Sequence, residues 1–290
     1  MKRLPPMIER DVSLQCYNSY GLSAKAEYYY HYYSEDELRD VLIWAGQKEI
    51  PVRVLGGGSN ILLSRRIIPG LIIHMGPCFI SIRRDYLLAG SGMGTSLAAL
   101  QARYYSLTGL EFLYGLPGDL GGALYMNARA YDRSISDIII SAKAMDEKGR
   151  IFWIKKNEMA FQYKDSVFQH RPWIILALLF RLRQGKKERI TQNMDRSISG
   201  RREKGHYDYP SCGSVFKNPY QAGIPAGKLV EELALKGKRR GGAEIFSKHG
   251  NFIINKESAS AEDILALLEL IRRQVQAKRG ITLDPEVEIW

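Results

Sequence analysis

The sequence predicts an α+β fold, because strand-like and helix-like segments are mixed without the regular strand–helix–strand alternation of a doubly wound sheet. Short apolar runs bounded by glycine and proline are typical of strands, whereas other segments repeat apolar residues at helical spacing. With 45% hydrophobic and 25% charged residues, the composition is that of a globular protein and excludes wholesale disorder. The 290 residues suffice for a large core and suggest about two domains.

Helices are expected at three places. The first is capped by Ser34 and closed by Gly46, and a shorter one covers residues 226–236 just before a glycine. The last begins after its cap, Ser260, and ends at Gly280. Its apolar residues recur every three or four positions, so they form one buried stripe.

Strands are expected earlier in the chain, at residues 51–55, 71–75, 86–89 and 173–182, with a hairpin at 138–154. From residue 184 to residue 204 the chain is polar and strongly basic, which marks a candidate boundary. We therefore divide the chain into residues 1–200 and residues 201–290.

The charge balance is strongly basic. Lys and Arg total 42 while Asp and Glu total 31, so the formal net charge is +11. A basic excess implies anionic partners, and nucleic acid, a membrane surface and phosphorylated small molecules all fit it. The basic runs lack interleaved aromatic residues and a known nucleic-acid-binding motif, so a nucleic-acid-binding module ranks last among the functions considered.

The compartment predicted for the protein is the cytoplasm. Charged residues at positions 9–11 stand where the apolar core of a secretory signal would follow the basic N-terminus. No apolar run approaches the roughly 18 residues of a membrane-spanning helix. The cysteines Cys16, Cys78 and Cys212 are far apart and form no CxxC pair, so no disulfide framework is indicated.

The first candidate site is a glycine-rich loop that directly follows the strand expected at 51–55. The loop consists of Gly56, Gly57, Gly58, Ser59 and Asn60. Consecutive glycines let a backbone approach a ligand closely, and successive N–H groups can form an anion-binding nest. The loop lacks both the ending of a Walker A motif and the third glycine of the Rossmann fingerprint. It indicates either phosphate binding or only a tight turn.

Two further glycine-dense segments favour a ligand over a simple turn. The stronger one contains Gly115, Pro117, Gly118, Gly121 and Gly122 and is followed by residues 126–131; residues 90–92 are a weaker candidate. Several such loops indicate one extended, phosphate-bearing ligand that lies against the backbone. The five histidines have no metal-ligand spacing, so no metal site is predicted.

Four polar residues are candidates for chemistry, but spacing alone assigns none of them a catalytic role. Ser214 follows a glycine and is typical of a turn, while Lys164 and Glu286 are typical of a solvated surface. No sequence feature lowers the pKa of Cys212, so a packed or exposed thiol is favoured over a nucleophile.

From Asn18 to Val287 the chain resembles the UDP-N-acetylenolpyruvoylglucosamine reductase (UDP-N-acetylmuramate dehydrogenase) family. The blocks that carry the resemblance are Leu55–Leu63 (LGGGSNILL), Gly109–Tyr131 (GLEFLYGLPGDLGGALYMNARAY), Tyr163–Phe168, Gly213–Pro219 (GSVFKNP), Ala226–Leu229, Lys248–Asn255 and Pro285–Val287. Each block alone is weak, and all of them in this order are highly specific.

The resemblance implies two parts and two cofactors. Residues 1–200 would be an FAD-binding part of the vanillyl-alcohol-oxidase type, made of two subdomains of about 1–80 and 81–200. Residues 201–290 would be a substrate-binding domain whose last strand returns Glu286 to the flavin site. The cofactors implied are FAD and NADPH. In that family the loop at 56–60 holds the FAD pyrophosphate, and the segment that ends with Asn127, Ala128 and Tyr131 lines the flavin.

The family's reaction reduces an enolpyruvyl group. NADPH reduces the flavin, which passes hydride to the methylene carbon of that group, and a serine protonates the neighbouring carbon. The motif match makes Ser214 the serine, Glu286 the carboxylate that acts with it, and Lys164 the cation beside the substrate carboxylate. A cation suits this place because hydride addition builds an enolate, and the hydroxyl delivers the proton from one face.

The same match implies how the substrate is held. Asn218 and Lys236 correspond to residues at the UDP phosphates, His249 lies where the uracil is contacted, and Arg202 is a further candidate for a phosphate contact. The partners implied are a UDP-sugar and NADPH, without nucleic acid or a membrane, and the protein is expected to be a monomer.

Two departures from the family pattern stand beside these residues. The family has arginine where this chain has Lys164, which loses a bidentate grip on a carboxylate, and glycines where this chain has Arg129 and Asp132. One hypothesis is that Arg129 supplies the guanidinium charge that Lys164 does not. The alternative is a catalytically impaired homologue that keeps a flavin or a nucleotide and has a binding or regulatory role.

Overall fold

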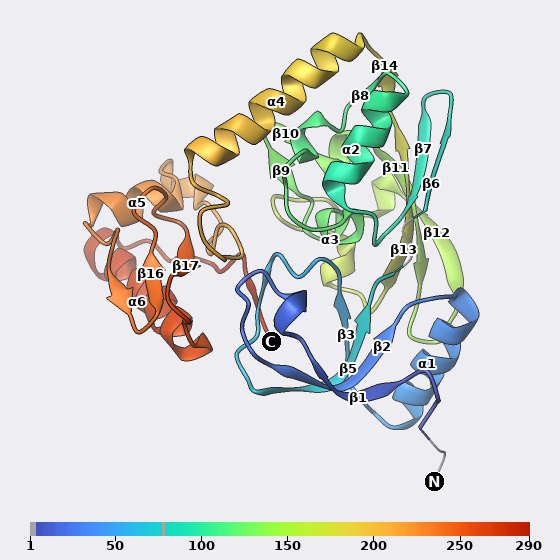
Figure 1. The fold of residues 1–290 in the computed structure, drawn as a ribbon, viewed down its shortest axis with the longest axis horizontal. Coiled ribbons are helices and arrows are strands. Elements are labelled where there is room, and N and C mark those ends of the chain that lie inside the picture. The colour runs from blue at the N-terminus through green and yellow to red at the C-terminus, as the bar shows by residue number, and fades with distance from the viewer. Residues whose placement is uncertain (1–3, 77–78) are drawn as a thin grey trace. The chain divides into compact units, whose positions relative to one another are not determined.

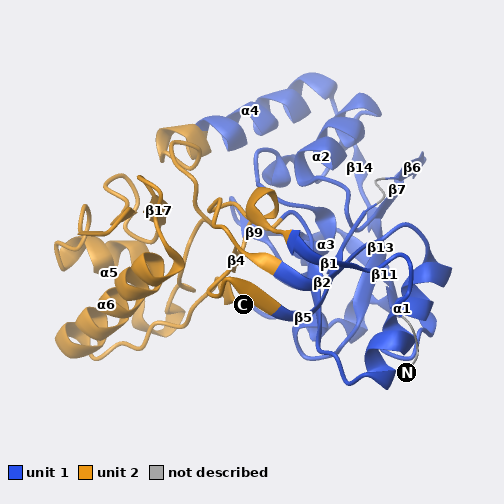
Figure 2. Cartoon of the chain, turned by 60° about the horizontal axis from the view of Figure 1, so that its bottom comes forward, with its two compact units in different colours: residues 1–12, 26–57, 69–199 blue, residues 13–25, 58–68, 200–290 orange. Residues whose placement is uncertain are grey.

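The computed structural model describes residues 4–76 and 79–290, so Cys78 lies outside the described residues. The chain divides into two compact units, coloured separately in Figure 2. Unit 1 comprises residues 1–12, 26–57 and 69–199, and unit 2 comprises residues 13–25, 58–68 and 200–290. Among the described residues, no helix is both long enough and apolar enough to cross a membrane.

The first sheet has the strand order β1-β2-β5-β3 (Figure 1). Its strands are β1 (Glu9–Ser13), β2 (Lys25–His31), β5 (Ile67–His74) and β3 (Val52–Leu55), and β3 runs parallel to β5. Helix α1 (Glu35–Gln47) shares a core with this sheet. The predicted cap is confirmed, because the Ser34 hydroxyl accepts from the N–H of Glu37 at 3.2 Å. The expectation that Gly46 closes the helix is wrong: the helix continues to Gln47, and the left-handed residue is Glu49.

The second sheet is antiparallel and has the order β12-β11-β13-β7-β6. Its strands are β6 (Ile80–Arg83), β7 (Tyr86–Gly90), β11 (Ile139–Met145), β12 (Ile151–Lys155) and β13 (Ile174–Arg181). Helices α2 (Thr95–Tyr104) and α3 (Leu120–Tyr125) pack into the core of this sheet. The expected hairpin and the buried strand are confirmed, because β11 pairs with β12 and β13 is buried along most of its length.

Unit 2 contains a small sheet covered by a long helix. The sheet is β15 (Arg239–Arg240), β16 (Ala243–Ile245) and β17 (Ile253–Asn255), and helix α6 (Ala261–Arg279) packs on it. The cap at Ser260 and the end at Gly280 are confirmed. Helix α5 (Ala226–Glu232) is shorter than expected, because Ala234 takes a left-handed conformation.

Helix α4 (Lys187–Glu203) is the main element that the sequence did not predict. Its buried residues follow helical spacing, but only Ile190 and Met194 are apolar; the next two are Ser197 and Arg201. Polar residues on the buried face therefore hid the stripe that identifies a helix. The mixture of helices and sheets confirms the α+β class.

The remaining elements are short. The paired strands are β4 (Ile61–Leu62) with β18 (Glu288–Ile289), β8 (Leu107–Thr108) with β14 (Arg183–Gln184), and β9 (Arg129–Ala130) with β10 (Arg133–Ser134). Single 3-10 turns lie at Gln15–Tyr17, Glu111–Leu113, Ile135–Asp137, Lys156–Glu158, Val167–Gln169 and Tyr220–Ala222.

Candidate active site

Three glycine segments of unit 1 pack directly against one another, and we call residues 56–57, 90–94 and 115–122 the glycine-loop cluster. A Cβ atom on Gly57 would lie 2.7 Å from the Cα atom of Gly118, and one on Gly121 would lie 2.9 Å from the Cβ atom of Ser91. Real Cβ atoms do not approach so closely. Glycine is therefore required because backbone contacts backbone, a reason the sequence alone did not reveal.

Asp119 lies at the centre of the glycine-loop cluster. Its carboxylate accepts hydrogen bonds from the N–H of Gly122, at 2.7 Å, and from the N–H of Gly57. A Cβ atom on Gly56 would collide with the same carboxylate. Burial raises the pKa of Asp119 to about 6, against the lowering effect of these N–H donors. Asp119 thus caps helix α3 and ties it to the loop that follows β3.

Hydrogen bonds between backbones join the segment at 90–94 to the segment at 115–122. The N–H of Leu120 donates to the carbonyl of Met93 at 2.9 Å, and the N–H of Gly121 donates to the carbonyl of Ser91 at 2.8 Å. Thr95 donates its N–H to the carbonyl of Gly118 at 3.1 Å. The segment at 115–122 therefore contacts both other segments within unit 1.

The glycine-loop cluster fits a phosphate-bearing cofactor. The Ser91 side chain is only 2% exposed, and its hydroxyl has no hydrogen-bond partner among the described residues. A buried hydroxyl without a partner is costly, so such a group marks a place where a polar ligand belongs. The sequence indicated residues 90–92 only as a weaker candidate segment and gave the Ser91 hydroxyl no role of its own, because a serine between two glycines is ordinary in a turn.

Asn127, at the end of the glycine-rich segment, braces the loop that carries Lys164. Its side-chain amide donates to the carbonyl of Gln162 at 2.8 Å, and its side-chain oxygen accepts from the N–H of Ser136 at 3.3 Å. Asn127 itself has φ = 42°, a left-handed conformation that asparagine tolerates better than most residues. Ala128 is buried beside it. The residue therefore positions the Lys164 loop from inside the fold.

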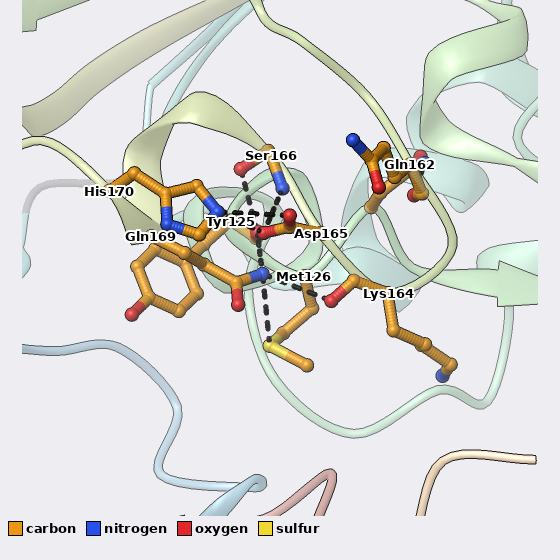
Figure 3. Close-up of polar contacts among 9 residues, drawn as sticks. Tyr125, Met126, Gln162, Lys164, Asp165, Ser166, Gln169 and His170 are labelled. Carbon is orange, nitrogen blue, oxygen red and sulfur yellow. Dashed lines mark hydrogen bonds and ion pairs between the residues drawn. The ribbon is translucent and has the colours of Figure 1, made fainter. Parts of the chain in front are cut away.

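Lys164 lies at the tip of a tight turn, where residues 162 and 165 pair and Lys164 has φ = 56°. The Lys164 carbonyl accepts from the Gln169 side chain at 3.1 Å, and the same amide donates to the Tyr125 carbonyl at 2.8 Å. Figure 3 shows the Lys164 side chain extending away from this network. The lysine is half-buried, and its backbone is held independently of its ammonium group.

The two departures from the glycine pattern belong to one exposed hairpin. Tyr131 and Asp132 are its turn residues and have φ = 51° and 57°, between the paired strands β9 and β10. The Arg129 guanidinium lies 3.5 Å from the Asp132 carboxylate, with the two side chains 45% and 100% exposed. Asp132 thus occupies a left-handed position for which glycine is the default residue. The Tyr131 hydroxyl donates to the carbonyl of Ser197 at 2.6 Å.

Ser214 and Glu286 come from segments that pair within unit 2. The N–H of Glu286 donates to the carbonyl of Val215 at 2.9 Å, so Glu286 lies beside the residue that follows Ser214. Asn60 donates its side-chain amide to the carbonyl of Glu286 at 3.0 Å and accepts at its own carbonyl from the N–H of Glu288 at 2.9 Å. The glycine-rich loop at 56–60 therefore ends in a residue that fixes the backbone of Glu286.

Asn251 holds the Ser214 segment from its other side. It is only 3% exposed, and its side chain both accepts from the N–H of Phe216, at 3.1 Å, and donates to the carbonyl of Phe216, at 2.8 Å. The carbonyl of Asn251 accepts from the N–H of Val215 at 2.9 Å. A buried amide with all these bonds rigidifies the segment, since each lost partner would leave a buried polar group unsatisfied.

Cys212 is not a nucleophile in this arrangement. Burial raises the pKa of its thiol to about 12, and the nearby charge of Glu286 raises it further. The thiol interacts with buried Tyr20, whose pKa burial likewise raises. A neutral, buried thiol is inert, as the sequence analysis favoured.

His249 and Lys236 share one electropositive neighbourhood in unit 2. The His249 ring lies 4.4 Å from Phe252 and 5.6 Å from His206, measured between ring centroids. Burial lowers the pKa of His249, and the charges of Lys204 and Lys236 lower it further. Burial likewise lowers the pKa of His206 to about 4. Both rings are therefore neutral at pH 7; sequence reasoning missed His206 because it belongs to no motif.

The other two predicted substrate contacts have separate places in unit 2. Asn218 accepts the N–H of Ala226 at 3.0 Å and so caps the start of α5. Arg202 is exposed in the last turn of α4.

Comparisons with known proteins agree on one family. Residues 26–155 match the family described as "FAD binding domain", and residues 205–290 match "UDP-N-acetylenolpyruvoylglucosamine reductase, C-terminal domain". A UDP-N-acetylenolpyruvoylglucosamine reductase of Caldanaerobacter subterraneus is 38% identical over 257 residues, which cover 88% of this chain and 84% of that protein. One of Staphylococcus aureus is 37% identical over 283 residues, 97% and 92% of the two chains.

A solved structure matches over almost its whole length. The crystal structure of UDP-N-acetylenolpyruvylglucosamine reductase from Thermus caldophilus has a TM-score of 0.83 with this fold and 32% sequence identity, and covers 98% of both chains. The fold is accordingly an FAD-binding domain of the vanillyl-alcohol-oxidase type joined to a C-terminal domain, as the resemblance implied.

Fold and site together define an FAD-dependent oxidoreductase. More particularly, the chain belongs to the UDP-N-acetylenolpyruvoylglucosamine reductase family, because relatives of that name match it at up to 38% identity over most of its length.

Gly57→Ala tests the backbone contact in the glycine-loop cluster. The new methyl group would lie 2.7 Å from the Cα atom of Gly118, so the two loops must separate. We expect FAD to bind at least about tenfold more weakly, measured by flavin fluorescence during titration of the flavin-free protein. Gly46→Ala is the control, because nothing lies within 4 Å of that added Cβ atom. Equal FAD affinity in both variants would contradict the steric argument.

Proposed function

We propose that this protein reduces UDP-N-acetylenolpyruvoylglucosamine to UDP-N-acetylmuramate, with FAD as cofactor and NADPH as reductant, in peptidoglycan precursor synthesis. The observation that carries the proposal is the pairing of the Ser214 segment with the Glu286 segment. The family match assigns Ser214 and Glu286 to proton transfer. These residues are 72 positions apart in the sequence and belong to backbone segments that hydrogen-bond to each other. The relatives' names support the substrate.

The glycine-loop cluster and the loop residues Ser59 and Asn60 would hold the cofactor. Close backbone packing, the Ser91 hydroxyl and the loop N–H groups provide the surface for a pyrophosphate. FAD, when bound, supplies hydride to the methylene carbon of the enolpyruvyl group. Gly115, Pro117 and the segment from Asn127 to Tyr131 would lie along the flavin.

Ser214 would deliver the proton that completes the reduction. Hydride addition at the methylene carbon leaves an enolate at the neighbouring carbon, and the Ser214 hydroxyl protonates that carbon from one face. A serine is a weak acid, so Glu286, whose backbone is fixed beside it, would orient the hydroxyl and, as a carboxylic acid, pass its proton to the serine oxygen; solvent water would then reprotonate Glu286. The product carries one new C–H bond at each carbon of the former double bond.

Lys164 would stabilise the charge that forms on the substrate carboxylate and enolate. The Lys164 backbone is held in a turn, which fixes where its side chain begins, and the side chain extends away from the hydrogen bonds of that turn. A preorganised cation stabilises developing charge more than a flexible one does. Arg129, exposed in the β9–β10 hairpin, is the candidate for the guanidinium that the family places at residue 164.

Unit 2 would bind the UDP portion of the substrate. Lys236 and Asn218 are assigned to the phosphates and His249 to the uracil, with Arg202 as a further phosphate contact. This assignment is supported by the charges of Lys204 and Lys236, which lower the pKa of His249. The neutral His249 ring lies beside Phe252. In this proposal residues 1–200 are the FAD-binding part, residues 201–290 bind the substrate, and the protein acts as a cytoplasmic monomer.

Flavin absorbance under anaerobic conditions tests the function. The purified protein is expected to be yellow, to bleach when NADPH is added, and to regain its colour when the enolpyruvyl substrate is added. Bleaching without recovery favours the impaired homologue instead. A colourless protein that FAD cannot reconstitute would contradict the reductase function.

Ser214→Ala separates the two half-reactions. NADPH should still bleach the flavin at the wild-type rate, whereas reoxidation by substrate should slow by about 10²–10⁴, because the proton donor is lost. Ser211→Ala, a serine-to-alanine change three residues earlier in the same segment, is the matched control and should behave as wild type. Equal loss of both half-reactions would remove Ser214 from proton transfer.

Arg129→Ala tests the compensation hypothesis for Lys164. If the guanidinium replaces the family's arginine, reoxidation by substrate should slow by about 10²–10³, with flavin content unchanged. Asp132→Ala, which removes only the carboxylate that pairs with Arg129, is the control and should keep most of the rate. Wild-type kinetics in the Arg129 variant would dismiss compensation and leave Lys164 as the cation.

A further inference from the structure

Asp119 is a buried acid to which the proposed chemistry assigns no role. It is 7% exposed and lies between the loop at 56–57 and the first turn of α3, in the middle of the glycine-loop cluster. Its carboxylate fills the space that a side chain on Gly56 would need. The residue is therefore built into the place where the proposed function puts the FAD pyrophosphate.

Only backbone N–H groups stabilise the charge of this carboxylate. The donors are Gly57, Gly122 and the N–H of Asp119 itself, and burial outweighs them, which leaves the pKa of Asp119 raised to about 6. The loop at 56–57, the loop at 90–94 and the segment 118–122 contribute no other titratable side chain. No neighbouring ionised group contributes to the shift. The pKa of Asp119 is therefore set by burial and by these N–H donors. A charged ligand that binds beside the carboxylate would shift this pKa.

A pyrophosphate is such a charge. A second negative group near a carboxylate disfavours the ionised form and raises its pKa further. The effect is large where both groups are out of water, because the interior screens charge poorly. The N–H of Gly57 donates to the Asp119 carboxylate. Gly57 also belongs to the loop that would hold the pyrophosphate. The carboxylate and the pyrophosphate would therefore lie about one residue's length of backbone apart.

We propose that Asp119 is a positioning residue of the cofactor site and that it takes up one proton when FAD binds. The ionised carboxylate holds the two loops together in the flavin-free protein. When FAD enters, the carboxylate becomes a carboxylic acid; it still caps α3 through one oxygen and no longer repels the pyrophosphate. This inference rests on the proposed function, because it requires FAD at these loops.

Proton uptake by Asp119 fixes the direction in which FAD affinity changes with pH. Proton uptake on binding makes affinity fall as pH rises, by up to about tenfold per unit between the pKa of Asp119 in the free protein and its higher value in the complex. The wild-type Kd for FAD should therefore increase from pH 6 to pH 8. In the Asp119→Asn variant, which cannot ionise, the Kd should be nearly constant over this range and lower than wild type at pH 8.

The experiment titrates the flavin-free full chain with FAD at pH 6, 7 and 8 and follows flavin fluorescence. Asp119→Asn is the test variant and Asp263→Asn is the control, since Asp263 also serves at a helix N-terminus, that of α6, but lies outside the glycine-loop cluster. The control should keep the wild-type slope. Calorimetry at pH 7 in two buffers of different ionisation enthalpy should count about one proton for wild type and none for Asp119→Asn.

A second variant, Asp119→Ser, keeps an N-cap oxygen without an ionisable group and serves if the amide disturbs folding. Near-constant Kd in either variant supports the proposal. The wild-type slope in both variants, or a wild-type proton count of zero, overturns it. If wild type binds no FAD at any pH, the proposed function fails as well, whereas tight binding without a pH slope refutes only the linkage.

Discussion

The contact between two backbones, at Gly57 and Gly118, is the constraint on which the cofactor site is built. The loop at 56–57 could not lie so close to the segment at 118–122 if Gly57 carried a side chain. The Asp119 carboxylate closes the contact, because it accepts from the loop at one end and from α3 at the other. A buried carboxylate raises the free energy of the folded chain, and close packing with several N–H donors offsets that cost.

The loop that begins at Gly56 ends at Asn60, a residue of unit 2 that forms two hydrogen bonds with the chain around Glu286. Asn60 fixes the backbone of Glu286 through its side chain and the backbone of Glu288 through its carbonyl. The carboxylate assigned to proton transfer therefore depends on the last residue of a loop assigned to the cofactor. A substitution at Asn60 would disturb both the cofactor loop and the backbone of Glu286. A loss of turnover alone would therefore not show which of the two caused it.

Sequence reasoning predicted the elements whose signals are local. The caps at Ser34 and Ser260, the β11–β12 hairpin and the buried strand β13 were all visible as short patterns. It missed α4 because Ser197 and Arg201 occupy its buried face. It also extended α5 past Ala234, whose left-handed conformation no residue preference announces. Local patterns thus recover elements, while their ends depend on tertiary contacts.

The residues of the candidate site likewise fall into those that local patterns identified and those that only the structure revealed. The motifs identified the glycine segments, Ser214 and Glu286, but not why they are glycines or what holds them. Asp119, Ser91, Asn251 and His206 act through long-range contacts, and a single sequence contains no signal for a contact between residues that are far apart in the chain. Likewise, the sequence showed Asp132 only as a departure from a family glycine, and the structure places it at a left-handed turn position.

Hydrogen–deuterium exchange of the backbone amides, with and without FAD, tests most directly whether the glycine-loop cluster is the cofactor site. We predict that FAD slows exchange at residues 56–60, 90–94 and 115–122 together, because one ligand would lie against segments that already contact one another. Protection confined to one of these segments, or located elsewhere in the chain, would contradict that prediction and separate the glycine loops from flavin binding.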